Sequence, residues 1–392
     1  MLSTAELTKI VLDSLKSITP EEIISRNQSL KNFLGDNSHY YLLAFGKGSS
    51  YFAQSILRAF PKMTRGVCLD ITKPERFDNK IEILIGDHPL PSERNIENTR
   101  QVIKFINEIP KNAKVVIIVC GGASALFTNP VNSLSETEDL VNKMLRASLS
   151  INQINTVRKH IDEVKGGQLA KLLNPRPSLN LYVSDVPDND LSVIGSGPTV
   201  LDPTTIDDAQ KITSSFGFDG KLTETPKDTS IFDSMENEVV ISIKDLLDNL
   251  EPNFKESVYR DDQFLAKDQD RVIAEIKELI RKPEKTFIFG GESQLKITAS
   301  GQGGRCSHLA LRILSEIKGD FTIASIATDG HDNSKAAGVI FNTNDLKTKI
   351  DQKAIDQSLN DFDSYNFFRY TNSLLLTGPL PVNLSDLLII SR

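Results

Sequence analysis

Residues 115–124 read VVIIVCGGAS, and this stretch decides the fold class. Its first five residues are a continuous β-branched run, which is typical of a strand buried on both faces of a parallel sheet. Gly121, Gly122, Ala123 and Ser124 follow the run, and this turn is expected to lead into a helix. Glycines let a backbone approach an anion closely, and a helix N-terminus offers free N–H groups. The turn therefore fits a phosphate, although a tight turn without a ligand would read the same way.

The same alternation of strand, glycine turn and helix is predicted before and after this stretch of the chain. The expected strands are residues 40–45, 81–85, 115–119, 179–184, 238–243, 286–289, 295–298, 321–327 and 387–390. Strands that alternate with helices predict an α/β protein. We expect a doubly wound, largely parallel, Rossmann-like sheet first, and a smaller α/β domain with a mixed sheet second. A polar stretch at about 218–235 is interpreted as a linker, so the expected domains are 1–230 and 231–392.

Composition narrows the classes of function. The chain has 392 residues and a formal net charge of -7, which argues against nucleic acid and anionic membranes as partners. Cys68, Cys120 and Cys306 are scattered, so neither a disulfide framework nor a cysteine metal site is expected. The N-terminal segment has charges within its apolar residues, unlike a signal peptide, and a cytoplasmic location is the expectation. The five histidines lack zinc-ligand spacing.

Residues that carry chemistry follow the predicted strands. Ligands of open α/β sheets bind beyond the carboxyl ends of the strands, and Lys47 and Ser124 lie there in the first half of the chain. Lys47 lies within Gly46–Ser50, where it could neutralise a phosphate or pair with a carboxylate, or remain a solvated loop lysine. If the two sheet edges face each other, these residues line one interdomain cleft.

Two arginines are candidate anion ligands. Arg305 follows the glycine-rich turn 301–304 at a predicted helix start, where the helix dipole disfavours a cation. That position suggests a compensating anion, although a surface arginine is the alternative. Arg158 belongs to the dense basic stretch 155–160, which could bind an anion or form a solvated face.

Carboxylates after strands are candidate Mg²⁺ ligands. Mg²⁺ prefers one or two carboxylates together with water and nucleotide phosphates. Asp185 and Asp329 directly follow predicted strands, and Glu292 follows another within Gly290–Ser293. Each could instead cap a turn or a helix.

Several motifs, taken in order, resemble the type II glycerate kinases, whose C-terminal domain is often called MOFRL. The matching stretches in the first half are AFGKGSS (44–50), GDHPLPSE (86–93), CGGASALF (120–127), INTVRKHIDEVKGGQLA (154–170) and SDVPDNDLSVIGSGPTVLDPTT (184–205). Those in the second half are GGES (290–293), GQGGR (301–305), ATDGHDNSKAAG (327–338) and TGPLPVNLSDL (377–387). The resemblance covers nearly the whole chain.

The resemblance implies an enzyme that transfers phosphate from ATP to D-glycerate, with Mg²⁺ or another divalent cation. It favours 2-phosphoglycerate as product, within a non-phosphorylative Entner-Doudoroff pathway. Under it, Lys47, Arg305 and Asp185 are expected to be catalytic. Lys47, Arg158 and Arg305 would bind substrate, and Asp185, Asp329 and Glu292 would bind the metal. The nucleotide phosphates would lie at Gly121, Gly122, Ser124, Ser196 and Gly197.

Some features depart from the family pattern, and other functions stay open. The family favours GGRNQE at 303–308 and TDGIDG at 328–333, whereas this chain has GGRCSH and TDGHDN. The third glycine of the family's GGGSAL is Ala123 here. Alternatives are phosphorylation at the 3-hydroxyl, an oxidoreductase acting on glycerate or hydroxypyruvate, and a non-catalytic sugar-acid sensor. No GxGxxG fingerprint supports the oxidoreductase. The expected partners are small molecules, and the sequence allows a homodimer.

Overall fold

The buried run at residues 115–119 lies inside a six-stranded sheet, as the sequence predicts. The structure is a computed structural model that describes residues 1–35, 38–74, 77–147, 149–348 and 350–392. The chain folds into two compact units, and we describe each by itself. The Rossmann-like unit comprises Pro20–Ser184 and Asn189–Val240, and the mixed-sheet unit comprises Met1–Thr19, Asp185–Asp188 and Ile241–Arg392.

The sheet of the Rossmann-like unit has the strand order β3-β2-β1-β4-β5-β6. Its strands are β1 (Tyr40–Phe45), β2 (Met63–Asp70), β3 (Ile81–Ile85), β4 (Lys114–Val119), β5 (Ser178–Val183) and β6 (Met235–Ile241). The pairs β3–β2, β2–β1, β1–β4 and β4–β5 are all parallel. The doubly wound, largely parallel sheet is confirmed.

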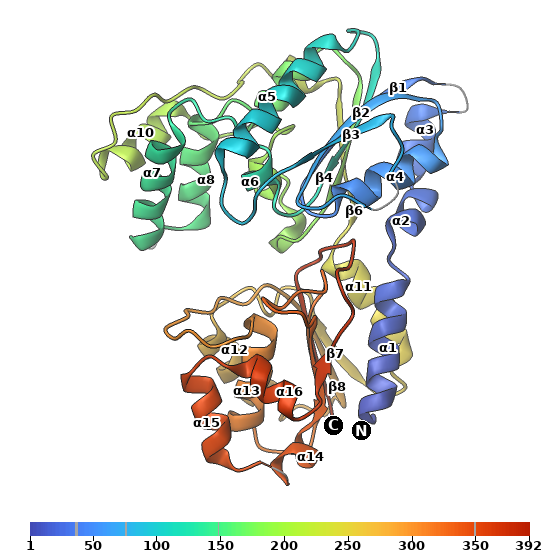
Figure 1. Ribbon diagram of the computed structural model, residues 1–392, viewed down its shortest axis with the longest axis vertical. Coiled ribbons are helices and arrows are strands. Elements are labelled where there is room, and N and C mark those ends of the chain that lie inside the picture. Colours follow the sequence, from blue (N-terminus) through green and yellow to red (C-terminus); the bar gives the residue numbers. More distant parts are fainter. Residues whose placement is uncertain (36–37, 75–76, 148, 349) are drawn as a thin grey trace. The chain divides into compact units, whose positions relative to one another are not determined.

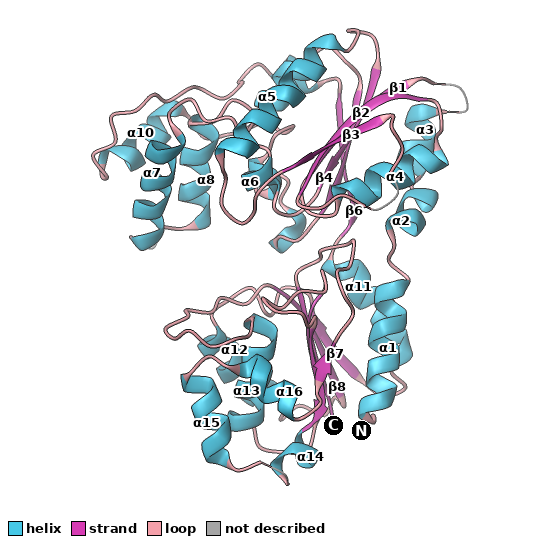
Figure 2. Cartoon of the chain, viewed as in Figure 1, coloured by secondary structure: helices cyan, strands magenta, loops and turns pink. Residues whose placement is uncertain are grey.

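Helices cover both faces of this sheet (Figure 1). The helices of this unit are α2 (Pro20–Arg26), α3 (Gln28–Leu34), α4 (Ser49–Ala59), α5 (Glu93–Glu108), α6 (Ala123–Leu126), α7 (Leu134–Arg146), α8 (Ile151–His160), α9 (Gln168–Leu173) and α10 (Ile206–Ser214), with 3₁₀ turns η2 (Ile194–Ser196) and η3 (Thr229–Phe232). Helices α7, α8 and α10 pack together beside the sheet (Figure 1), and the 3₁₀ turn η1 (Pro187–Asn189) lies where the chain passes between the two units. Across the sheet, the connection from β1 to β2 leads toward the β3 edge, whereas the connection from β3 to β4 leads back toward the β6 edge. Right-handed crossovers therefore place α4 and α5 on opposite faces, as Figure 2 shows. The strand order reverses between β1 and β4, which is where ligands bind in such sheets.

The mixed-sheet unit contains the strand order β11-β10-β9-β12-β8-β7. Its strands are β7 (Val258–Asp261), β8 (Thr286–Gly291), β9 (Thr322–Ala327), β10 (Gly338–Asn342), β11 (Leu374–Leu375) and β12 (Asp386–Ser391). Its helices are α1 (Thr4–Lys16), α11 (Ile243–Leu250), η4 (Glu251–Asn253), α12 (Gln269–Leu279), α13 (Arg305–Glu316), α14 (Thr343–Lys347), α15 (Gln352–Asn360) and α16 (Ser364–Tyr370). Strands β7 and β8 are parallel, whereas β12 is antiparallel to both of its neighbours, so the expected mixed sheet is confirmed.

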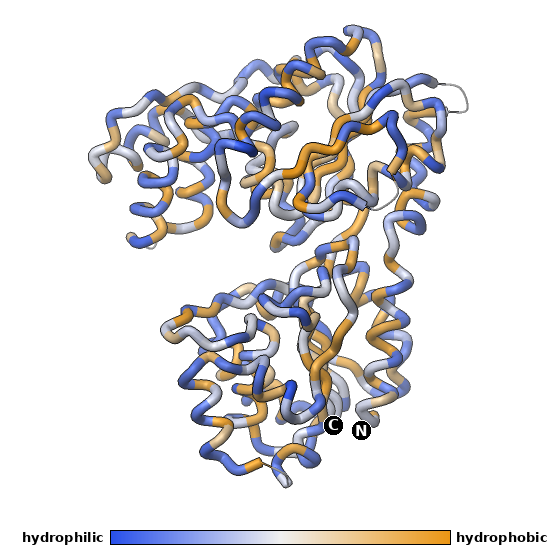
Figure 3. Tube along the Cα trace, in the orientation of Figure 1, coloured by the Kyte–Doolittle hydropathy of each residue, from blue (hydrophilic) through white to orange (hydrophobic). Residues whose placement is uncertain are grey.

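Apolar strands form the core of each unit. In β4, Val115 through Val119 are fully buried, and Figure 3 shows apolar residues concentrated along the strands. Phe45 stacks on Phe127 with ring centroids 4.4 Å apart, which joins β1 to the segment after α6. No helix in the described part of the chain combines the length and the apolar run that a membrane crossing requires.

The division into units differs from the expected boundary at residue 230. Helix α1 contacts α11, β9 and β10, and the Thr322 hydroxyl donates to the Leu2 carbonyl at 2.6 Å. The first nineteen residues therefore belong to the mixed-sheet unit. Leu7 and Val11 recur at helical spacing along α1 and are fully buried. Helical periodicity shows which face is buried but not against which partner.

Three local expectations also need correction. The strand expected at 238–243 is β6, which adjoins β5 in the first sheet rather than beginning the second unit. Residues 295–298 alternate in polarity but form no strand, because only the neighbouring Gln294 makes an isolated bridge, to Asp268. The stretch 218–235 is no free linker. Thr225 is buried there and donates to Asp202 at 3.2 Å, which anchors the stretch to the Rossmann-like unit.

Candidate functional site

Two glycine turns meet where the strand order of the Rossmann-like unit reverses. The backbone N–H of Lys47, after β1, donates to the carbonyl of Gly121, after β4, at 2.8 Å. Gly46 has a φ of +117°, and a side chain there would overlap the carbonyl of Cys120. This close approach explains why a glycine precedes Lys47. It also joins two motifs that lie about 75 residues apart in the sequence.

The side chains of Lys47 and His88 converge on Gly122. A Cβ built on Gly122 would lie 2.9 Å from His88 Cδ2 and 3.3 Å from Lys47 Cγ. Gly122 has a φ of +79°, a backbone conformation that glycine adopts without strain. The turns after β1, β3 and β4 therefore meet at one point of the sheet edge.

Ser124 and Ser196, both expected to bind nucleotide, lie together. Their hydroxyl oxygens are 3.1 Å apart. Ser196 is fully buried and has a φ of +61°, between Gly195 at +58° and Gly197 at +65°. Such strain in a non-glycine residue persists only where surrounding contacts enforce it, and it concentrates at functional sites. The carbonyls of Ser196 and Gly197 accept from Gly166 and Gly167 at 2.9 and 2.8 Å, which fixes this loop beside the KGG motif.

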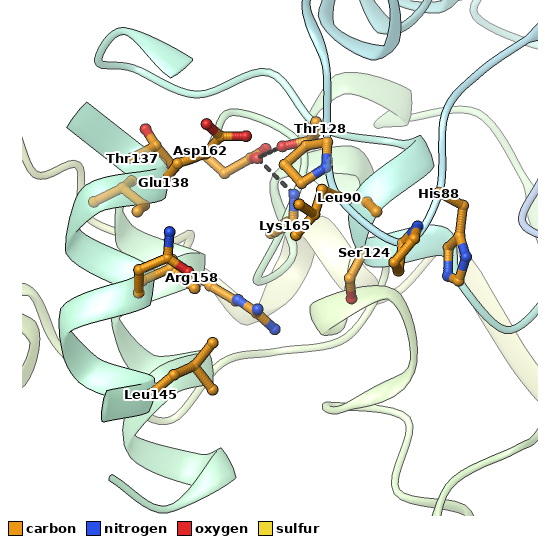
Figure 4. Close-up of a pocket in the computed structure, with 17 residues that line it drawn as sticks. His88, Leu90, Ser124, Thr128, Thr137, Glu138, Leu145, Arg158, Asp162 and Lys165 are labelled. Carbon is orange, nitrogen blue, oxygen red and sulfur yellow. Dashed lines mark hydrogen bonds and ion pairs between the residues drawn. The ribbon is translucent and has the colours of Figure 1, made fainter. Parts of the chain in front are cut away.

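A pocket of about 270 Å³ lies beside these turns, in the Rossmann-like unit (Figure 4). Helix α7 supplies an apolar wall through Val141 and Leu145, and Ile161, directly after α8, adds to it. Polar side chains line the rest, namely His88, Ser124, Thr128, Thr137, Glu138, Asn142, Arg158, Asp162 and Lys165. An apolar wall with a few converging polar groups is the usual character of a small-molecule site.

Arg158 extends from α8 into this pocket toward Ser124 (Figure 4). Among the described residues, no carboxylate forms an ion pair with its guanidinium, although its side chain is partly buried. Burial lowers the pKa of Arg158, because removal from water disfavours the charged form. A guanidinium stays protonated even so, and a desolvated cation without a counterion is costly. This arrangement favours an anionic ligand.

Lys165 is a second cation in the pocket, and the protein holds it in place. Its ammonium donates to Asp162 Oδ2 at 2.6 Å and to the Phe127 carbonyl at 3.3 Å. The Thr128 hydroxyl donates to the same carboxylate oxygen at 2.5 Å. Burial lowers the pKa of Lys165, Asp162 opposes that shift, and the nearby Arg158 adds to it. Among the described lining residues, Asp162 and Glu138 are the carboxylates, and only Asp162 pairs with a pocket cation.

The other basic residues of this stretch have structural partners. Lys159 is buried and pairs with Asp202 at 3.2 Å. His160 is fully buried between the Thr156 carbonyl at 2.8 Å and Glu224 at 3.2 Å. Of Arg158, Lys159 and His160, only Arg158 lines the pocket. The sequence alone did not show which of the three would do so.

Arg305 lies in the mixed-sheet unit as the first residue of α13. Its Nε and one terminal nitrogen bind the two oxygens of Asp386 at 3.1 and 3.2 Å, and its other terminal nitrogen pairs with Glu292. The predicted compensating anions are therefore carboxylates of the protein itself. Burial raises the pKa of Asp386 to about 7, despite the opposing effect of Arg305.

The three expected metal ligands do not form one cluster. Within the described ranges, no group of three or more His, Cys, Asp or Glu side chains is placed to hold a metal ion. Glu292 is occupied by Arg305. Asp185 Oδ2 accepts from Asn383 at 3.2 Å, and the Asp329 carbonyl accepts from Leu380 at 2.9 Å, so the turn 380–385 contacts both remaining aspartates. Mg²⁺ usually takes one or two protein carboxylates and completes its ligands with water and phosphate, so Asp185 and Asp329 have a suitable chemistry for it.

The segments that depart from the family pattern are held by structural contacts, in which the family-like Asp332 takes part. Asp332 is buried and accepts from the N–H groups of Cys306 and Ser307 at 2.9 and 2.8 Å, which caps α13. The Ser307 hydroxyl donates to the same carboxylate at 2.6 Å. His308 stacks on Phe362, and its Nδ1 bonds to Gln269 Oε1 at 2.9 Å. His331 bonds through Nδ1 to the Ser334 carbonyl at 3.2 Å.

Sequence reasoning missed the acidic residues that support the site. Asp70 ends β2, a strand that we did not expect, and binds the turn that carries Lys47. The N–H groups of Gly48 and Ser50 donate to its two oxygens at 3.1 and 3.0 Å. Asp162 precedes its partner Lys165 by three residues, so the two can pair within a single turn of the chain. That spacing was a usable signal, whereas nothing local marks Asp70.

Comparison with known proteins identifies the family. Residues 6–228 match the family described as "Domain of unknown function (DUF4147)", and residues 285–386 match the MOFRL family. A D-glycerate 2-kinase from Thermotoga maritima is 31% identical over 97% of this chain and 96% of its own. A protein from Agrobacterium vitis with the provisional name hydroxypyruvate reductase is 31% identical over 87% of this chain and 84% of its own.

A solved structure agrees with the sequence matches. The crystal structure of a glycerate kinase from Thermotoga maritima superimposes with a TM-score of 0.84 at 29% identity, covering 99% of both chains. The likeness therefore extends over both units and not over an isolated motif. The chain belongs to the type II glycerate kinase family, in which a DUF4147 domain precedes a MOFRL domain.

Proposed function

We propose that this protein is an ATP-dependent D-glycerate kinase that phosphorylates the 2-hydroxyl. The observation that carries the proposal is the partly buried guanidinium of Arg158, which faces Ser124 in a pocket and has no carboxylate partner among the described residues. Both substrates of the proposed reaction are anions, ATP through its phosphates and glycerate through its carboxylate. Relatives named D-glycerate 2-kinase and glycerate kinase support the choice of substrate.

The pocket suits part of a nucleotide or the acid substrate. Val141, Leu145 and Ile161 offer an apolar surface, and Arg158 and Lys165 offer positive charge. We assign the phosphate contacts to this basic end, together with the turn at Gly121, Gly122 and Ser124. The loop at Ser196 and Gly197 fixes Ser124 and completes that end.

Phosphoryl transfer depends mainly on positioning and charge stabilisation, because the protein forms no covalent bond itself. Lys47 would neutralise charge on the transferring group or hold the glycerate carboxylate. Arg305 keeps N–H groups beyond those bound to Asp386 and Glu292, and its proposed role is likewise to bind an anion. Mg²⁺, when bound, would neutralise charge on the ATP phosphates, and Asp185 and Asp329 are the residues that would hold it. Either aspartate could instead orient the attacking hydroxyl.

A kinase assay with matched substrates tests the proposal. The protein is incubated with ATP, MgCl₂ and D-glycerate, L-glycerate or lactate, and ADP release is measured. We expect release that depends on D-glycerate. A second arm offers hydroxypyruvate and NADH and follows absorbance. NADH oxidation without glycerate-dependent ADP release would identify an oxidoreductase instead. Binding of glycerate without either reaction would indicate a sensor.

A further inference from the structure

The helix that follows Lys47 begins without a cap of its own. Helix α4 has Gly48 as its N-cap residue, and no side chain there accepts a hydrogen bond from the first turn. The first N–H groups of a helix need an acceptor, and their dipole attracts negative charge. In a Rossmann dinucleotide site, the ligand pyrophosphate lies at the N-terminus of the helix after the first strand, the position that α4 has here.

Asp70 supplies this acceptor from the neighbouring strand. Its carboxylate accepts from Gly48 at 3.1 Å, from Ser50 at 3.0 Å and from Ile71 at 2.7 Å. Asp70 has no exposed surface. The carboxylate therefore occupies the place that a ligand anion would need. Burial raises the pKa of Asp70, and the hydrogen bonds from Ser50, Ile71 and Gly48 oppose that shift.

The same residue joins several turns of the sheet edge. The Asp70 carbonyl accepts from Gly86 N–H at 2.9 Å, which fixes the turn before His88. The neighbouring Leu69 carbonyl accepts from Gly46 N–H at 3.1 Å and from the Ser49 hydroxyl at 3.1 Å. The end of β2 thus holds the residues on both sides of Lys47 as well as the turn after β3.

We propose that Asp70 is a positioning residue, an internal anion that fills the N-terminus of α4, fixes the turn carrying Lys47 and closes the first βα turn to a dinucleotide pyrophosphate. The role of Asp70 in positioning Lys47 for catalysis rests on the proposed kinase function. The claim that the Asp70 carboxylate fills the N-terminus of α4 does not. The anion sites of the unit are consequently the Lys47 side chain and the pocket of Arg158. This assignment favours a kinase over a dinucleotide-dependent reductase.

Removal of the carboxylate, with formate as its replacement, tests the proposal. In Asp70→Ala, formate can enter the vacated space and accept from the N–H groups of Gly48 and Ser50. We expect the amide resonances of Gly48 and Ser50 to shift saturably with formate in this variant and not in the wild-type protein. With D-glycerate and ATP, kcat/KM should fall about 10- to 100-fold, since small misplacements of catalytic groups have effects of this size. Formate should restore part of that loss.

The control is Asp351→Ala, which removes a carboxylate cap from α15, where Asp351 accepts from Ala354 at 2.8 Å. Its kcat/KM should stay at the wild-type value and should not respond to formate. If formate does not shift the Gly48 and Ser50 resonances in folded Asp70→Ala, the claim that the Asp70 carboxylate fills an anion position at the N-terminus of α4 is wrong. Wild-type kcat/KM in that variant would overturn the positioning role.

If Asp70→Ala does not fold, Asp70→Asn replaces it, because Asn keeps the shape but has one acceptor oxygen. Faster hydrogen exchange at Gly48 or Ser50 is then expected, and unchanged exchange at both would contradict the proposal. The resonance and exchange measurements need no substrate. They therefore decide the structural claim even if the protein does not phosphorylate glycerate.

Discussion

Arg158 and Arg305 were both predicted to bind substrate, and the structure gives them different surroundings. Arg305 binds Asp386 through two nitrogens and also pairs with Glu292. Arg158 has no carboxylate partner among the residues that the structure describes, and it faces a pocket. An arginine whose charge is already balanced adds mainly to stability and local order. An arginine left unbalanced in a partly buried pocket has more to gain from an anionic ligand.

The largest expected effect comes from Arg158→Gln. The variant should lower kcat/KM for D-glycerate and ATP at least about 100-fold, the size of effect that follows when a positioned hydrogen-bond donor to a developing charge is removed. The free energy of unfolding should stay the same or rise, because a desolvated charge is removed. Steady-state kinetics and urea unfolding measure the two effects. Arg146→Gln, which changes an exposed arginine of α7, is the control. Equal losses of kcat/KM in both variants would refute a specific role for Arg158 in substrate binding.

Arg305→Met should affect stability more than Arg158→Gln does. It leaves the buried Asp386 carboxylate without its partner, which should lower the free energy of unfolding by about 2 kcal/mol, a value reduced for the partial exposure of Arg305. The double variant with Asp386→Asn should regain part of that loss. Urea unfolding of both single variants and the double variant gives the coupling energy. Purely additive losses would show that the pair does not stabilise the protein.

A third prediction concerns how the stability of the mixed-sheet unit depends on pH. His308 lies on α13, the helix that begins with Arg305. Burial and the nearby Arg312 lower the pKa of His308 to about 4 from 6.5. The unfolded chain therefore takes up a proton near pH 6.5, whereas the folded protein does so only near pH 4. Stability is then full above about pH 6.5 and falls by up to about 3 kcal/mol as the pH drops to about 4. Unfolding of wild-type protein and His308→Gln across this range checks the claim, and parallel curves would contradict it.

The smallest effect is expected from Ser124→Ala, on the Arg158 side. Loss of one hydroxyl contact removes about 1 kcal/mol, which corresponds to a roughly fivefold higher KM for the substrate that it binds. Its partner Ser196 keeps its own hydroxyl and buried position. Measurement of KM for ATP and for glycerate separately would show which substrate this end of the pocket holds. No change in either KM would place Ser124 outside the binding surface.

The sequence predicts the fold well where the pattern is local. The β-branched run of β4 and its glycine turn indicate the parallel sheet, and the start of α1 is likewise set locally, because Ser3 and Glu6 form a capping box there. The sequence could not predict which unit α1 packs against, because its contacts, α11, β9 and β10, all lie in the second half of the chain. The strand expected at 295–298 was wrong for the same reason, since alternation does not supply a neighbouring strand.

Prediction of the site had a similar limit. Strand-end residues such as Lys47 and Ser124 could be found, because a parallel sheet gathers them at one edge. The counterions could not, because Asp386 lies 81 residues from Arg305, and Asp70 lies 20 residues from Ser50 on a strand that we did not expect. Whether a cation is balanced depends on such long-range contacts.

The position of the phosphate on the product tests both the proposed kinase activity and its regiochemistry. A proton-coupled ³¹P spectrum of the product made from ATP and D-glycerate distinguishes the two esters, because phosphorus on O2 couples to one carbon-bound proton and phosphorus on O3 couples to two. We expect a doublet, which identifies 2-phosphoglycerate. A triplet would identify the 3-phosphate and contradict the proposed regiochemistry, and the absence of any phosphate ester would contradict the proposed kinase.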